Sequence, residues 1–110
     1  MSVQHHDLAA GRWKGFTFVE QMANIASEVE RALNWRAKNN PIYAQRAMER
    51  ALELMDLTLA GTKNAARLRE LARVREALVG FFTGNNVFVS TEASWRKYFA
   101  PFTYAARRNH

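Results

Sequence analysis

Apolar residues recur at steps of three and four over most of the chain, which places them on one face of an α-helix. The first series begins at Phe18. Thr17 and Glu20 have the spacing of a capping box, in which each side chain accepts a hydrogen bond from the other residue's backbone amide. We therefore predict a helix from residue 17 to about residue 38, whose buried stripe is Phe18, Met22, Ile25, Val29 and Leu33.

Two further helices are predicted as a pair. Asn40 and Pro41 indicate the start of the second helix, because asparagine caps well and proline fits the first turn, and Gly61 ends it. The turn after Gly61 is short, so the third helix is expected to pack antiparallel to the second. Gly84 is its predicted C-cap.

A fourth helix is predicted near the C-terminus. Residues 83 to 90 have a strand-like composition but no partner strand, so we expect an ordered loop there. Ser90 or Thr91 then caps a helix with apolar positions at Trp95, Phe99, Phe102 and Ala106. Pro101 has no amide hydrogen, and we expect it to kink or split this helix near Ala100.

Four amphipathic helices with short connections predict an all-α fold, an up-and-down four-helix bundle. A chain of 110 residues suits one core, so residues 17 to 110 are expected to form a single domain. Residues 1 to 16 show no clear period and are expected to form an N-terminal arm. The sequence leaves open whether Trp13 and Phe16 of this arm pack on the bundle or on another chain.

The composition is typical of a soluble globular protein, with 48% hydrophobic and 24% charged residues. There is no cysteine, no apolar stretch long enough to cross a bilayer, and no secretion signal in the first ten residues. We therefore expect a cytosolic protein without a membrane partner.

The net charge of +6 lies in the second half of the chain. Residues 1 to 57 hold seven basic and seven acidic side chains, whereas residues 58 to 110 hold nine and three. A basic surface attracts nucleic acid or an acidic protein, although such an excess also serves solubility alone. Because arginine suits phosphate binding, the candidate binding residues are Arg67, Arg69 and Arg73. Glu70 and Glu76 have the helical spacing to pair with Arg73.

A polar stripe on the first predicted helix borders its apolar face. It consists of Gln21, Asn24, Glu28, Arg31 and Trp35. Such a row lines either a groove or subunit interface, where Arg and Trp are favoured anchors, or a half-buried seam within the monomer. Arg31 and Trp35 are therefore further candidates for partner binding, including binding of a second copy in a homodimer.

Histidine occurs only at positions 5, 6 and 110, so no helix carries a histidine for acid–base or nucleophilic catalysis. The carboxylates are the remaining candidates for chemistry. Glu49, Glu53 and Asp56 share one helical face, and Glu28 lies on the preceding helix. Carboxylates that face one another can hold Mg²⁺. A Mg²⁺ site at these four residues is therefore our alternative hypothesis, and the leading one is a binding protein without a cofactor. The simpler interpretation is solvated helices with ion pairs from Arg46 to Glu49 and from Arg50 to Glu53.

Residues 27 to 31 and 53 to 56 resemble the acidic motifs of MazG-type nucleotide pyrophosphohydrolases. That resemblance implies an all-helical, Mg²⁺-dependent enzyme that cleaves nucleoside triphosphates. Ser27 and Arg31 stand where the motif requires acids, and an arginine there competes with a metal ion.

A broader resemblance covers most of the chain from residue 21 onward. The segments from 21 to 32, 47 to 57 and 95 to 107 are similar to a group of small prokaryotic helical-bundle proteins without an assigned function. This resemblance implies a prokaryotic source and no particular site residues. The leading hypothesis from the sequence is a non-enzymatic binding module, and the alternative is the Mg²⁺-dependent hydrolase.

Overall fold

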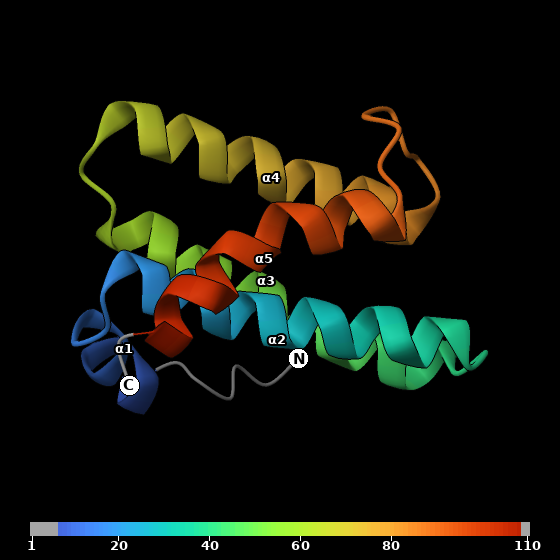
Figure 1. Ribbon diagram of the computed structural model, residues 1–110, viewed down its shortest axis with the longest axis horizontal. Helices are drawn as coiled ribbons and strands as arrows, with labels where there is room; N and C mark the ends of the chain where they lie inside the picture. Colours follow the sequence, from blue (N-terminus) through green and yellow to red (C-terminus); the bar gives the residue numbers. More distant parts are fainter. Residues whose placement is uncertain (1–6, 109–110) are drawn as a thin grey trace.

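The computed structural model describes residues 7 to 108, and Figure 1 shows that helices dominate the fold. This part of the chain contains no strand, and its five helices are α1 (Asp7–Lys14), α2 (Phe18–Ala37), α3 (Pro41–Gly61), α4 (Ala65–Thr83) and α5 (Glu92–Arg108). The all-α prediction is confirmed, with five helices in place of the predicted four. The additional helix, α1, lies in the segment that the sequence predicted to be an arm.

The helix ends follow the capping signals of the sequence. Thr17 Oγ1 accepts from the Glu20 amide at 3.1 Å, and Glu20 Oε1 accepts from the Thr17 amide at 2.8 Å, which completes the capping box. Asn40 Oδ1 accepts from the Tyr43 amide at the start of α3. Gly84 ends α4 at a φ of 93°, a left-handed conformation that glycine adopts without steric cost. Three helix boundaries are therefore set by local hydrogen bonds and backbone freedom.

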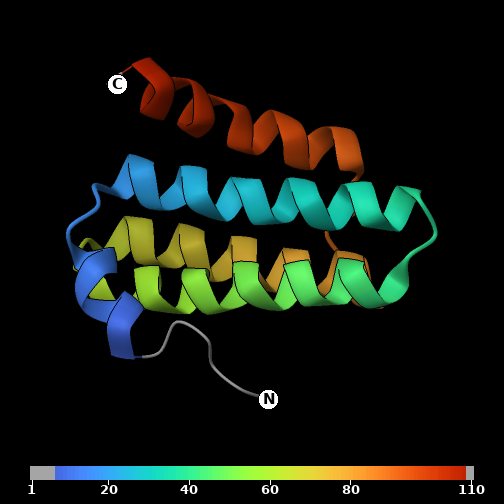
Figure 2. The same cartoon turned by 90° about the horizontal axis from the view of Figure 1, so that it is seen from below.

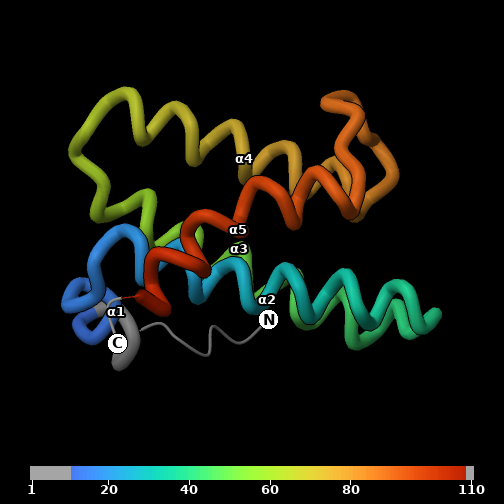
Figure 3. Tube along the Cα trace, viewed as in Figure 1, coloured from blue at the N-terminus to red at the C-terminus, as the bar shows by residue number. Residues whose placement is uncertain are grey.

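Helix α2 lies at the centre of the fold. It packs along α3 on one side and α5 on the other, while α4 packs on α3 (Figure 2). The Cα trace in Figure 3 shows that α1, the start of α2, the end of α3, the start of α4 and the end of α5 all lie at one end of the molecule. We call this the α1 end. No helix among residues 7 to 108 has the length and apolar character that a bilayer span requires.

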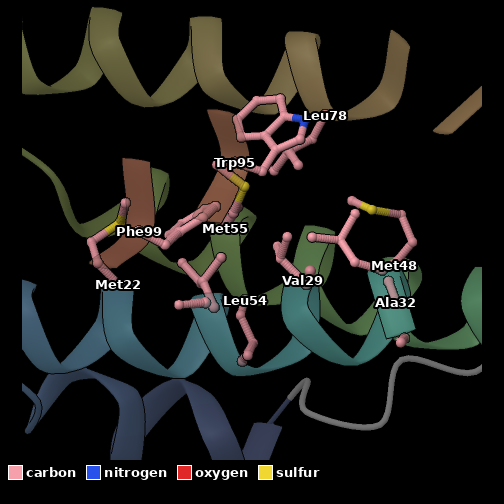
Figure 4. Packing of buried hydrophobic residues seen from close by; sticks show 14 of the residues in the cluster. Met22, Val29, Ala32, Met48, Leu54, Met55, Leu78, Trp95 and Phe99 are labelled. Carbon is pink, nitrogen blue, oxygen red and sulfur yellow. The ribbon is translucent and has the colours of Figure 1, made fainter. Parts of the chain in front are cut away.

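A single hydrophobic core joins the helices (Figure 4). The predicted stripe of α2 is buried apart from Phe18, which is partly exposed. The other large contributors come from α3, α4 and α5, and they include Met48, Leu54, Met55, Leu71, Leu78, Trp95 and Phe99. Full burial of one such side chain contributes roughly 1.5 to 3 kcal/mol, so the core supplies most of the favourable folding energy.

Helix α5 continues through Pro101 as one helix. Thr91 is its cap, because Thr91 Oγ1 accepts from the Ser94 amide at 3.0 Å. A split near Ala100 is therefore absent, and the kink stays a prediction. Pro101 and Lys97 are both exposed. The carbonyl that loses its helical partner at Pro101 therefore belongs to an exposed residue, which lowers the cost of the missing bond.

The connection between α4 and α5 is held tightly against the end of α4. A Cβ on Gly80 would lie 2.6 Å from the backbone oxygen of Asn85, so only glycine allows this approach. The Asn86 side chain accepts from the Ser90 amide and donates to the Ser90 carbonyl, which closes the loop. Val89 is forced to a φ of 54°, a strained conformation for a β-branched residue. As predicted, this segment forms no strand.

We predict that Gly80→Ala lowers the free energy of unfolding by more than about 1 kcal/mol, because the added methyl group meets backbone rather than a movable side chain. Gly61→Ala is the matched control, since a Cβ there has no neighbour within 4 Å. It should leave stability unchanged or raise it by up to about 1 kcal/mol. Urea unfolding followed by circular dichroism measures both, and equal losses would contradict the close approach at Gly80.

Candidate functional site

Trp13 fixes α1 to the rest of the molecule. Its side chain is 6% exposed, and its indole Nε1 donates to Thr58 Oγ1 on α3 at 3.0 Å. Thr58 Oγ1 in turn donates to the Leu54 carbonyl at 2.9 Å, so the buried hydroxyl uses its hydrogen and one lone pair. Gln21 Nε2 on α2 donates to the Trp13 carbonyl at 2.9 Å. Helix α1 therefore packs on α2 and α3 of the same chain.

A pocket of about 430 Å³ lies where α1 meets the start of α4. Its apolar and aromatic wall includes Trp13, Phe16 and Phe18. Its basic residues are Lys14, Lys63 and Arg67, and none of the described residues that line it carries a carboxylate. We call this site the cationic pocket. The helix ends that line it, from α1, α3 and α4, lie at the left of the molecule in Figure 1.

Arg67 is held in the cationic pocket by an aromatic ring instead of an acid. The centre of its guanidinium lies 4.0 Å from the ring centroid of Phe18. Phe18 also packs edge-on against Phe102 of α5, with centroids 6.0 Å apart. A cation–π contact leaves the charge of the guanidinium intact. Arg67 therefore contributes a full positive charge to a pocket whose lining, within the described part of the chain, holds no acid.

Arg69 and Arg73 lie exposed on α4, outside the cationic pocket. Glu70, predicted as a partner for Arg73, accepts a hydrogen bond from the Tyr98 hydroxyl at 2.7 Å. Within residues 7 to 108 no ion pair includes Arg69 or Arg73, whereas Arg75 on the same helix pairs with Asp56 at 2.7 Å. The predicted neutralisation of Arg73 is therefore not present.

Arg31 and Trp35 lie in a different place from the α4 arginines. Glu28 accepts from Arg31 at 2.7 Å and from Arg50 of α3 at 3.3 Å. Trp35 packs edge-on against Tyr43 of α3, with centroids 4.8 Å apart. Glu28 and Trp35 thus lie at the seam between α2 and α3, whereas the exposed Arg31 also lines a groove between α2 and α5. Neither Arg31 nor Trp35 lines the cationic pocket.

The four carboxylates considered for Mg²⁺ do not share a site, and three of them bind separate side chains. Glu28 pairs with two arginines, Asp56 pairs with Arg75, and Glu49 accepts from Gln45 at 3.4 Å. Glu53 has one buried oxygen, Oε2, without a hydrogen-bond partner. In the described part of the chain no three acidic or histidine side chains are close enough to hold a metal ion. The carboxylates are therefore not gathered as the alternative required.

The ion pairs expected within α3 are replaced by other contacts. Arg50 reaches Glu28 on α2 instead of Glu53. Arg46 lies over the Tyr43 ring at 5.7 Å instead of pairing with Glu49. Packing against α2 brings Glu28 within reach of Arg50, which intrahelical spacing alone does not reveal.

A second groove, of about 650 Å³, lies between α2 and α5. It also contains arginines, but Arg96 pairs there with Glu30 at 3.0 Å and with Glu92 at 3.2 Å. The hydrogen bond that Arg96 donates to Glu30 is the main reason that the pKa of Arg96 is raised above its ordinary value. This groove is therefore partly neutralised, unlike the cationic pocket.

Sequence reasoning missed Lys14, Lys63 and Trp13 as site residues. Lys14 is the last residue of α1, and Lys63 lies in the short turn between α3 and α4. The sequence did contain a signal for these lysines. Successive antiparallel helices bring every second connection to the same end of the molecule. The connection from α1 to α2 and the connection from α3 to α4 are therefore expected to lie together, with Lys14 and Lys63 near each other.

The chain matches no family model, and no curated protein or solved structure matches it either. The function is therefore inferred from the geometry of residues 7 to 108.

The environment of the Tyr98 phenol leads us to predict that the stability of the protein depends on pH. Burial, followed by the hydrogen bond to Glu70 and its charge, raises the pKa of the Tyr98 phenol above its ordinary value of 10.0. A raised pKa in the folded state gives stability that is complete below the unfolded pKa and lost as the pH rises above it. We expect the free energy of unfolding to fall progressively as the pH rises above about 10, and Tyr98→Phe to make that fall shallower. Tyr104→Phe, at a tyrosine that is 65% exposed, is the control. Identical pH profiles for both variants in urea unfolding would refute this role of Tyr98.

Proposed function

We propose that the protein is a non-enzymatic binding module that binds single-stranded nucleic acid at its α1 end. The observation that carries the proposal is the cationic pocket, which Lys14, Lys63 and Arg67 line and in which the described lining residues include no acid. Arg69 and Arg73 extend the positive charge along α4. Neutralisation of backbone phosphates by such side chains releases counterions and drives binding.

Single strands suit this surface better than a duplex. Single-stranded sites combine positive charge with aromatic rings on which unstacked bases lie. Phe16 supplies such a ring, because it lines the cationic pocket and is 38% exposed. A duplex hides its bases and requires a long row of cations, but α4 carries Glu70 and Glu76 among its arginines.

An acidic protein is the other partner that the charge favours, and it is treated as an outcome of the test below. The Mg²⁺-dependent hydrolase is not proposed, since no observation brings its carboxylates together. Assembly as a homodimer, a cytosolic location and the up-and-down arrangement of four long helices stay predictions. None of them is required for binding at the cationic pocket.

We predict that the protein binds a fluorescein-labelled single-stranded RNA at about 150 mM salt, where screening removes weak nonspecific attraction. Arg67→Ala should raise the Kd by about tenfold and reduce the slope of log Kd against log salt by about one. Arg46→Ala is the matched control, because Arg46 also lies over an aromatic ring but belongs to the first half of α3, and α3 starts at the end of the molecule opposite α1. Its effect should be less than about twofold. Fluorescence anisotropy across a salt series gives all three values.

Two outcomes would contradict the proposal. Equal effects of Arg67→Ala and Arg46→Ala would mean that the cationic pocket is not the binding surface. A poly-glutamate peptide that displaces the RNA with equal affinity would identify the surface as a site for acidic protein.

A further inference from the structure

We infer that the cationic pocket binds one nucleotide through a terminal phosphate monoester, so that the protein recognises the phosphorylated end of a strand. This inference rests on the proposed function and adds the chemical group that the site selects. Its grounds are the size of the pocket, its charge and the placement of its aromatic wall.

The size of the cationic pocket favours a single nucleotide. Its volume of about 430 Å³ lies near the lower end of the range for small-molecule sites, roughly 300 to 1,000 Å³. The pocket lies at the end of the bundle, between α1 and the start of α4. It is therefore a place for one terminal residue of a strand, whereas the middle of a strand needs a continuous groove that passes across the surface.

The charge of the cationic pocket favours a monoester over a diester. A terminal phosphate monoester carries about −1.5 to −2 at neutral pH, whereas each internal phosphate of a strand carries about −1. Lys14, Lys63 and Arg67 line the pocket, and no carboxylate among the lining residues that the structure describes opposes them. Three cations around one anion gain more from the more highly charged group.

The contacts of the cations leave them available to a phosphate. Arg67 is positioned by the Phe18 ring at 4.0 Å and not by an acid. Lys14 and Lys63 are exposed side chains without an ion pair in the described part of the chain. The start of α4 is not the basis of the site, since Asn64 Oδ1 already accepts from the Arg67 amide at 2.9 Å.

The aromatic wall of the cationic pocket offers a ring on which the base of the terminal nucleotide can stack. Trp13 and Phe16 pack edge to face, with centroids 5.6 Å apart and planes 84° apart. Trp13 is buried against Thr58, whereas Phe16 is the partly exposed member of the pair. A base that stacks on Phe16 makes contacts that depend little on its identity. We therefore expect selection for the terminal phosphate and little preference among the four bases.

The test compares RNA hexamers that carry a 5′-phosphate, a 3′-phosphate or hydroxyl groups at both ends, together with a free nucleoside monophosphate. At about 150 mM salt, at least one phosphorylated hexamer should bind about tenfold more tightly than the hydroxyl hexamer. Lys63→Gln, at an exposed position where unfolding is not expected, should reduce this ratio to below about threefold. Arg69→Gln is the control, because Arg69 lies outside the pocket and should weaken all hexamers without changing the ratio.

The outcomes distinguish failure of this inference from failure of the proposed function. Equal affinity for phosphorylated and hydroxyl hexamers overturns the inference and leaves nucleic-acid binding in place. Absence of binding by every hexamer, with binding of the monophosphate, overturns the proposed function and supports the phosphate pocket as a site for free nucleotides. Absence of binding by all four probes overturns both.

Discussion

The hydrogen bond from the Trp13 indole to Thr58 is the interaction on which the α1 end depends. A helix of eight residues is too short to be stable alone in water, so α1 persists because its tryptophan is buried in the common core. The bond satisfies the indole N–H where water is excluded, and an unsatisfied polar group there would cost about 1 to 3 kcal/mol. Gln21 holds the Trp13 carbonyl from α2. Together these contacts hold α1 in place, so that its last residues form one wall of the cationic pocket.

The placement of charge distinguishes the cationic pocket from the rest of the surface. Outside the pocket, Arg96 pairs with Glu30 and Glu92, and Arg75 pairs with Asp56. At the α1 end, Arg67 is held by the face of an aromatic ring, which positions a cation without cancelling its charge. A net charge of +6 alone says little about function, because it also serves solubility. Three basic residues around one pocket, whose described lining holds no acid, indicate a binding site more specifically than the net charge does.

Local chemistry determined what the sequence was able to predict. The Thr17 capping box and the glycine at position 84 depend on neighbours within a few residues, and the structure has these features where they were predicted. Helix α1 was missed because one buried tryptophan makes no periodic pattern. Pairs such as Arg50 with Glu28 join residues on different helices, so helical spacing alone suggested other partners. The cationic pocket was found only in part for the same reason, since Arg67 was recognised and the two lysines from distant turns were not.

The central claim is that the α1 end is the binding surface, and nuclear magnetic resonance of the ¹⁵N-labelled protein tests it most directly. Titration with a single-stranded RNA at physiological salt should shift the backbone amides of residues 13 to 16 and 61 to 69, with the Trp13 indole signal moving more than those of Trp35 and Trp95. The amides of the loop from 84 to 91, which joins α4 to α5 at the far end of the molecule, should stay in place. Shifts confined to that loop or to the seam between α2 and α3, with residues 61 to 69 unchanged, would contradict the account.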